Sequence, residues 1–161
     1  MNKIIIVIGQ SAAGKTTFVK SKFLKSGGEN KVSENGVKYY ETDDVIAIGS
    51  YYTGIRCEGT DTTGYLFLPK IIDFIKGLKT DKAVLAEGDR INNKEFFDFV
   101  KGLECEKEIY FLTCPIDVSL KRRIEAGAKP TEKFIKGTKT KSQNMAMYIK
   151  SIGLNINLIN S

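Results

Sequence analysis

The sequence contains the segment Gly9-Gln10-Ser11-Ala12-Ala13-Gly14-Lys15-Thr16, which directly follows the apolar run Ile4-Ile5-Ile6-Val7-Ile8. It fits the pattern G-x-x-x-x-G-K-[ST], in which small residues let consecutive backbone N–H groups wrap a phosphate. The β-branched run at residues 3–8 predicts a strand buried on both faces, and residues 15–24 predict a helix. The pattern therefore stands between a strand and a helix, which is the setting in which it binds phosphate.

We call residues 9–16 the glycine loop and expect it to bind the phosphates of a nucleotide. Lys15 would bring positive charge to the terminal phosphates, and the Thr16 hydroxyl would ligate Mg²⁺. The predicted nucleotide-binding residues are Gly9, Ser11, Ala12, Ala13, Gly14, Lys15, Thr16 and Thr17.

Composition limits the possible chemistry. A chain of 161 residues predicts one domain, residues 1–161, and the formal charge of +6 favours polyanionic partners. The sequence has no histidine, which excludes Ser-His-Asp triads and His-ligated metals and leaves general-base chemistry to a carboxylate. Three cysteines without a C-x-x-C spacing argue against disulfides and zinc, so we expect a reducing cytoplasm. The opening apolar run is too short to span a membrane, so no membrane association is expected.

The remaining pattern predicts alternating strands and helices. The predicted strands are residues 37–41, 82–86, 108–114 and 154–160; the predicted helices are residues 66–78, a segment capped by Asn92 or Asn93, residues 118–127 and residues 142–151. Such alternation after a glycine loop indicates an α/β fold with a doubly wound sheet, whose ligands bind at the carboxyl ends of the strands.

Acidic residues follow two of the predicted strands. Asp43 and Asp44 come after residues 37–41, where one carboxylate could accept the proton of an acceptor hydroxyl while the other caps a helix; which does which stays open, with Asp43 slightly preferred. Glu87 and Asp89 follow the third strand, where Glu87 could hold Mg²⁺ through water. Arg90 could pair with either acid or reach a substrate phosphate.

Residues 51–64 have no helical period and are rich in hydrogen-bonding side chains, so we interpret them as an ordered polar loop. Its candidates for acceptor recognition are Arg56, Thr60 and Asp61, although an ordinary surface loop fits each of them about as well. Tyrosines at 39, 40, 51 and 52 could stack on a base, but packing is their commoner role.

A basic segment follows the fourth strand. Residues 121–150 contain many Lys and Arg and only two Glu, and we interpret residues 121–141 as a lid over the phosphates. Arg122 and Arg123 would stabilise charge on a transferring phosphoryl group, whereas for Lys139 and its neighbours a lid contact and a nucleic-acid contact both stay open.

Taken together, GQSAAGKT, the segment ETDD, the acidic end of the third strand and LKRRIEAG resemble the P-loop kinases of the nucleotide and polynucleotide kinase group. The resemblance implies a three-layer fold with a five-stranded parallel sheet, the use of ATP and Mg²⁺, and an aspartate after the second strand as base. Asp43 or Asp44 occupies that place here.

Three further segments, GIRCEGTDTTGYLFLP, VLAEGDRINNKEFF and KGTKTKSQN, are similar to a set of small bacteriophage-associated kinases that phosphorylate hydroxymethyluracil within DNA. This resemblance implies a modified pyrimidine in DNA as acceptor and the host cytoplasm as location. A kinase acting on a free nucleoside or nucleoside monophosphate is the alternative enzyme. A nucleotide-hydrolysing switch is the third hypothesis, although the N-K-x-D element of guanine-selective switches is absent from the sequence.

Overall fold

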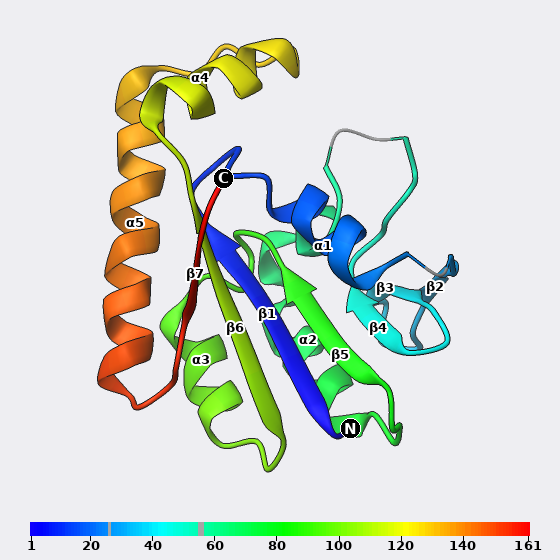
Figure 1. Cartoon of the computed structure of the whole chain (residues 1–161). Coiled ribbons are helices and arrows are strands. Elements are labelled where there is room, and N and C mark those ends of the chain that lie inside the picture. The colour runs from blue at the N-terminus through cyan, green and yellow to red at the C-terminus, as the bar shows by residue number, and fades with distance from the viewer. Residues whose placement is uncertain (26, 55–56) are drawn as a thin grey trace.

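The structure is a computed structural model that describes residues 1–25, 27–54 and 57–161 (Figure 1). Its strands are β1 (Lys3–Gly9), β2 (Glu29–Val32), β3 (Lys38–Glu41), β4 (Val45–Ile48), β5 (Ala83–Glu87), β6 (Glu106–Thr113) and β7 (Asn157–Asn160). Its helices are α1 (Lys15–Phe23), α2 (Leu68–Gly77), α3 (Lys94–Lys101), α4 (Ile116–Glu125) and α5 (Glu132–Ser151), with short 3₁₀ turns at Thr60–Thr62 and Tyr65–Phe67.

The described strands form one sheet in the order β2-β3-β4-β5-β1-β6-β7. The pairs from β4 through β5, β1 and β6 to β7 are all parallel, whereas β2 and β3 are antiparallel additions beside β4. The sheet is therefore mixed and seven-stranded, not purely parallel with five strands as the resemblance implied. We call the edge at which the parallel strands end the carboxyl edge.

Helices cover both faces of the sheet, as the alternating pattern predicted. Successive side chains of β1 point to opposite faces, so Ile4, Ile6 and Ile8 pack in one core with helices α2, α3 and α5. Ile5 and Val7 pack on the other face with Val19 of α1. In Figure 1 the helices α2 and α3 lie behind the sheet, and α1 lies in front of its upper part.

The region around Asp43 and Asp44 differs from the expectation. Residues 37–41 were expected to be a parallel strand ending at the carboxyl edge, but β3 runs antiparallel to β4. The turn between them therefore lies at the opposite edge, where the Asp44 carbonyl accepts a hydrogen bond from the Ala83 N–H at the start of β5. The four-residue advance along β5 from Ala83 to Glu87 puts about 13 Å between this turn and the carboxyl edge.

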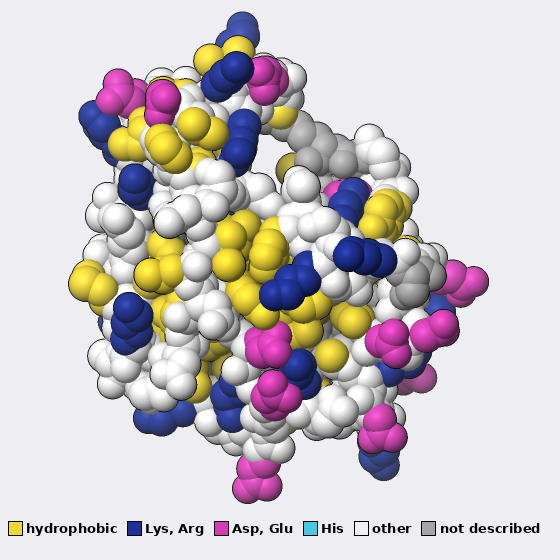
Figure 2. All heavy atoms as spheres, viewed as in Figure 1, with side chains coloured by type: hydrophobic (Ala, Val, Ile, Leu, Met, Phe, Trp, Pro, Cys, Tyr) yellow, Lys and Arg dark blue, Asp and Glu magenta, His cyan; other side chains and the backbone are white. Residues whose placement is uncertain are grey.

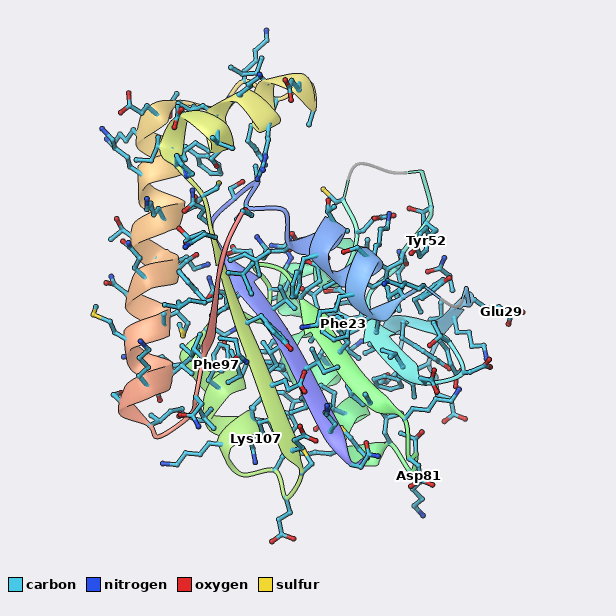
Figure 3. All side chains as sticks on the ribbon, in the orientation of Figure 1. Phe23, Glu29, Tyr52, Asp81, Phe97 and Lys107 are labelled. Atoms are coloured by element: carbon cyan, nitrogen blue, oxygen red, sulfur yellow. The ribbon has the colours of Figure 1, made fainter. Side chains whose placement is uncertain are left out.

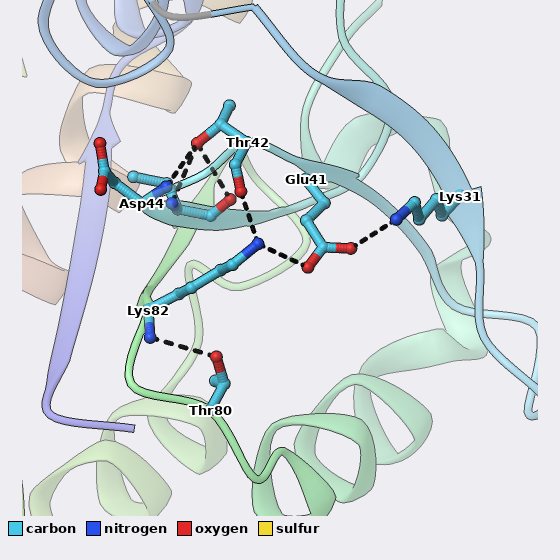
Figure 4. Close-up of polar contacts among 7 residues, drawn as sticks. Lys31, Glu41, Thr42, Asp44, Thr80 and Lys82 are labelled. Carbon is cyan, nitrogen blue, oxygen red and sulfur yellow. Dashed lines mark hydrogen bonds and ion pairs between the residues drawn. The ribbon is translucent and has the colours of Figure 1, made fainter.

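Polar contacts fix this turn (Figure 4). The Thr42 hydroxyl accepts hydrogen bonds from the N–H groups of Asp44 and Val45, at 3.3 and 3.0 Å. Lys82 at the start of β5 binds the Glu41 carboxylate and the Thr42 carbonyl, at 2.8 and 2.7 Å. Asp43 and Asp44 thus belong to a well-anchored turn that is remote from the glycine loop, and neither caps a helix.

The basic segment is more helical than expected. The last helix was expected to begin near residue 142, but α5 begins at Glu132, where the Thr131 side chain accepts a hydrogen bond from the Phe134 N–H as an N-cap. We call residues 116–141, which comprise α4, its connection to α5 and the first half of α5, the α4–α5 arm. In Figure 1 it stands above the carboxyl edge. None of the helices in the described part of the chain is both long and apolar enough to cross a bilayer.

Candidate functional site

A cleft of about 1080 Å³ opens at the carboxyl edge. Figure 2 shows the hollow beneath the upper lobe of the molecule, which is the α4–α5 arm. The glycine loop forms its floor, and its walls come from residues 57–61, residues 87–90 and the arm. Described residues with charged side chains that line it are Lys15, Glu58, Asp61, Glu87, Asp89, Arg90, Arg122 and Arg123.

Both glycines of the glycine loop have backbone conformations that favour glycine. Gly9 has a φ of 150°, and a Cβ there would lie 2.1 Å from the Leu112 carbonyl oxygen, so only glycine fits beside β6. Gly14, with a φ of 80°, precedes α1, and no side chain caps this helix. The first N–H groups of α1 are thus available to an anion, because helix N-termini carry unsatisfied donors and partial positive charge. The Lys15 amine lies over the same loop and donates to the carbonyls of Gly9 and Gln10, at 3.2 and 3.1 Å.

The glycine loop is also held from outside by contacts that sequence reasoning missed. The buried Gln10 amide donates to the Cys114 carbonyl at 2.9 Å. The Ser119 hydroxyl of α4 donates to the Ser11 carbonyl, and the Ser11 N–H donates to the Thr138 hydroxyl of α5 at 3.4 Å. The arm therefore contacts the loop through both α4 and α5. The sequence indicated only that these helices belong to the segment expected over the phosphates, and not that Ser119 and Thr138 would bind the loop.

Thr16 and Glu87 meet at the centre of the cleft. The Thr16 hydroxyl donates to a Glu87 carboxylate oxygen at 2.7 Å. Burial raises the pKa of Glu87 from 4.5 to about 7, while the hydrogen bond from Thr16 and the charge of Lys15 act in the opposite direction. A Cβ on Gly59 would come within 2.7 Å of the Glu87 carboxylate, so the backbone of residue 59 packs directly against this acid.

The pair Thr16 and Glu87 fits Mg²⁺, which prefers oxygen ligands and keeps several waters when proteins bind it. No group of three or more Cys, Asp or Glu side chains within the described ranges is arranged to hold a metal by itself. The residues thus suit a cation whose other ligands are water and phosphate oxygens.

Residues 60–63 join the wall beside Glu87. Asp61 lines the cleft, and one of its carboxylate oxygens accepts a hydrogen bond from the Asp89 N–H at 3.2 Å. Thr60 is fully buried and donates to the Glu87 carbonyl at 2.6 Å, so its hydroxyl supports the wall. Arg90 lines the cleft and its Nε donates to the Thr63 carbonyl at 3.4 Å. Arg56, the third loop residue expected to recognise the acceptor, lies outside the described residues.

The chain between β4 and Thr60 is tied to α1. Glu58 is ion-paired with Lys20 and also accepts a hydrogen bond from the Tyr52 N–H at 2.7 Å. Figure 3 shows Tyr52 beside α1, where its hydroxyl donates to the Leu24 carbonyl at 3.1 Å. Tyr52 is therefore engaged in anchoring this segment, as is the buried Tyr40, whose ring packs against it at 5.5 Å.

The α4–α5 arm brings basic side chains over the glycine loop. Arg122 donates to the Ala12 carbonyl at 3.2 Å, and the guanidinium of Arg123 lies 5.3 Å from the centre of the Phe134 ring. Lys141 of α5 binds both carboxylate oxygens of Asp89, at 2.9 and 3.0 Å, and so connects the arm to the opposite wall. Lys139, in contrast, is not among the described residues that line the cleft.

Comparison with known proteins gives a distant similarity. No protein-family model matches the chain. Over 149 residues the chain is 26% identical to a protein of Autographa californica nuclear polyhedrosis virus described as "Putative bifunctional polynucleotide kinase/RNA ligase". The aligned segment covers 92% of this chain but only 21% of that relative, so the chain spans about a fifth of the relative's length.

Proposed function

We propose that the protein is an ATP-dependent and Mg²⁺-dependent phosphotransferase whose acceptor is a hydroxyl group of a nucleotide unit in a polynucleotide. The observation that carries the proposal is the meeting, in one cleft, of an uncapped helix N-terminus with Lys15, the Thr16–Glu87 pair and the carboxylate of Asp61. The similarity to a viral protein named for polynucleotide kinase and RNA ligase activity supports the same class of reaction.

On this proposal the glycine loop holds the phosphates of the donor. The N–H groups at the start of α1 and the Lys15 amine face the terminal phosphates, and Thr16 and Glu87 hold Mg²⁺. Bound there, Mg²⁺ would neutralise charge on the phosphate oxygens. Arg122 and Arg123 on the α4–α5 arm, acting as a lid, would stabilise the charge that develops on the transferring group.

The acceptor hydroxyl needs a carboxylate on the opposite wall, and we assign this role to Asp61. The acids that line the cleft are Glu58, Asp61, Glu87 and Asp89. Glu58 and Asp89 are ion-paired, and Glu87 already accepts the Thr16 hydrogen bond. Asp61 is exposed and makes no ion pair with any residue in the described ranges, and the hydrogen bond from the Asp89 N–H engages one of its two carboxylate oxygens and leaves the other available.

The assignment replaces Asp43 and Asp44, which lie at the other edge of the sheet. In the reaction, the hydroxyl oxygen bonds to the terminal phosphorus and the bond between that phosphorus and the nucleoside diphosphate oxygen breaks. The hydroxyl proton passes to the Asp61 carboxylate.

The test of function is transfer of labelled phosphate from ATP to a panel of acceptors. The panel contains DNA and RNA with 5′-hydroxyl ends, DNA containing hydroxymethyluracil, free nucleosides and nucleoside monophosphates. Label on a polynucleotide supports the proposal, and the hydroxymethyluracil arm tests the narrower acceptor that the sequence resembles. Label only on free nucleosides or monophosphates, or hydrolysis of ATP without transfer to any acceptor, overturns it.

Asp61→Asn should lower the rate of transfer by about 10²-fold or more, because positioned general bases contribute on the order of 10²–10⁴-fold. Asp43→Asn is the matched control, since this carboxylate lies in the β3–β4 turn, and its rate should stay within about twofold of wild type. The measurement is the transfer rate at saturating ATP and acceptor. Equal losses in the two variants would defeat the assignment of Asp61.

A further inference from the structure

A second depression lies on α5 beside the cleft. Its volume is about 460 Å³, and its lining residues are Thr131, Lys133, Phe134, Gly137, Thr138 and Lys141. Residues 134, 137, 138 and 141 are three or four apart and so share one face of the helix. We call this depression the α5 groove. Phe134 and Thr138 also line the main cleft, so the two hollows share a wall.

The α5 groove exposes an aromatic ring beside open space. Phe134 is 47% exposed, so a large part of its side chain remains accessible. The guanidinium of Arg123 lies 5.3 Å from the centre of its ring. Gly137 follows within the helix, and a Cβ built there would meet no atom within 4 Å. Packing within the described chain therefore does not require glycine at this position, although glycine costs a helix interior about 1 kcal/mol relative to alanine. Its effect is to leave room next to Phe134.

A lysine lies at each end of the α5 groove. Lys133 is exposed and makes no ion pair with any residue of the described ranges. Lys141 lies at the end nearer the Asp89 wall, to which it is bound. Lys136 is paired with Glu132 on the same helix and does not line the groove. On the upper lobe in Figure 2, dark blue basic side chains lie beside yellow hydrophobic ones.

We propose that the α5 groove binds a segment of single-stranded nucleic acid, with a base stacked on Phe134 and the neighbouring phosphates at Lys133 and Lys141. The proposal rests on the proposed function, because the groove adjoins the cleft in which the acceptor would react. An aromatic face between cations suits a strand, since each base offers a flat apolar surface and each link carries a negative charge. An acidic peptide would satisfy the lysines but leave the aromatic ring unused.

The experiment measures binding of fluorescent oligonucleotides of about 10 nucleotides, a length within the usual site size for one single-strand binding surface. Single-stranded DNA, single-stranded RNA and duplex DNA are compared by fluorescence anisotropy at several salt concentrations, with poly-glutamate as a polyanion without bases. We expect both single strands to bind more tightly than the duplex and poly-glutamate. Tighter binding of the duplex, or equal binding of poly-glutamate, overturns the proposal.

Three variants then test the α5 groove. Phe134→Ala should weaken single-strand binding by about 5-fold to 100-fold, the range of one lost base–aromatic stack. Lys133→Ala should reduce the slope of log K against log salt concentration by about 0.7, as expected for one lost phosphate contact on a single strand. Gly137→Leu should fill the groove and weaken binding without lowering the melting temperature, because leucine favours the helix.

Matched controls come from the far end of α5. Met147→Ala removes another exposed apolar side chain and Lys150→Ala another exposed lysine, and neither residue lines the groove. Both should bind oligonucleotides as the wild type does. Wild-type binding by Phe134→Ala and Gly137→Leu together would overturn the proposal.

Two readouts separate this proposal from the proposed function. Lys133→Ala and Gly137→Leu should keep wild-type transfer to the shortest acceptor that is phosphorylated and lose it on longer strands. If no acceptor is phosphorylated, the proposed function fails, whereas the binding data still decide whether the groove holds a strand. If transfer occurs and these two variants affect all acceptor lengths equally, the groove proposal fails and the function stands.

Discussion

At the scale of single residues, Glu87 combines burial with a position in the cleft. It is 1% exposed, yet one of its oxygens accepts the Thr16 hydrogen bond and the backbone of Gly59 packs against it. An acid in such a place prefers to be neutral until a cation neutralises it, because desolvation penalises the charged form. This explains why its pKa lies near 7 when no cation contributes.

The raised pKa makes stability depend on pH. Between pH 4.5 and about 7 the folded protein holds a proton on Glu87 that the unfolded chain has released. The free energy of unfolding should therefore fall as pH rises through this window, by about 3 kcal/mol in total for a shift of this size. Glu87→Gln should remove that part of the fall, which urea unfolding at several pH values without divalent cations will measure. Parallel curves for the variant and the wild type would contradict the assignment.

The sequence was sufficient to predict that three residues of the cleft lie together, but not which residues support them. Lys15, Thr16 and Glu87 follow from a motif and from a strand end, and the structure brings them together as expected. Thr60 was expected at the acceptor but is buried, because its hydroxyl satisfies the Glu87 carbonyl. Such a contact joins residues 27 positions apart, and no local pattern encodes it.

At the scale of elements, the end of β4 supports the wall of the cleft. Gly49 has a φ of 100°, and a Cβ there would lie 1.8 Å from the Gly59 carbonyl oxygen. Ser50 and Gly59 form an antiparallel bridge, and Gly59 in turn touches Glu87. The close approach of two backbones at Gly49 thus sets the position of the acid in the site.

Gly49→Ala should destabilise the fold by more than about 2 kcal/mol, because it adds both backbone strain and a clash with main-chain atoms that cannot move aside. Gly77→Ala at the end of α2 is the control, since a Cβ there meets nothing within 4 Å. It should be neutral or stabilising by up to about 1 kcal/mol. Urea unfolding of both variants measures the difference, and similar stabilities would refute the account of Gly49.

The strand direction around Asp43 shows where local patterns mislead. Residues 45–48 are Val, Ile, Ala and Ile, all buried, which is typical of a central parallel strand. The expectation that an aspartate caps a helix after residue 44 left these four residues out of the sheet. It therefore made residues 37–41 the parallel strand and put the two acids at the wrong edge. The apolar run was the available indication of β4, whereas the antiparallel pairing of β2 and β3 depends on distant partners.

At the scale of the whole molecule, burial is distributed unevenly between the sheet and the α4–α5 arm. Residues 120–134 are all partly or fully exposed, whereas β1 from Ile4 to Gly9 is buried throughout. The basic composition of the arm could be predicted from sequence. Its long helix could not, because the signal for the start of α5 is a single capping threonine.

The uneven burial predicts a gradient of local stability. Amide hydrogens of residues 120–134 should exchange faster than those of β1, β5 and β6, because regions with few buried contacts open locally at low cost. Adding a non-hydrolysable ATP analogue with Mg²⁺ should slow exchange in this segment if Arg122 and Arg123 close on the phosphates. Hydrogen exchange followed by mass spectrometry gives both comparisons. Uniform exchange would contradict the gradient of stability. Exchange that the analogue leaves unchanged would contradict the role of the arm as a lid.

The two hydrogen bonds that the Lys15 amine makes to the Gly9 and Gln10 carbonyls have a consequence for selectivity. Because its charge is already partly compensated by the loop's own backbone, an incoming anion competes with those carbonyls for the same amine. A small anion such as chloride can replace only part of these contacts, so we expect it to gain little from that exchange. A polyphosphate would replace both carbonyls and bind the α1 N–H groups at once, so we expect the loop to favour polyphosphates over small single anions without a steric barrier.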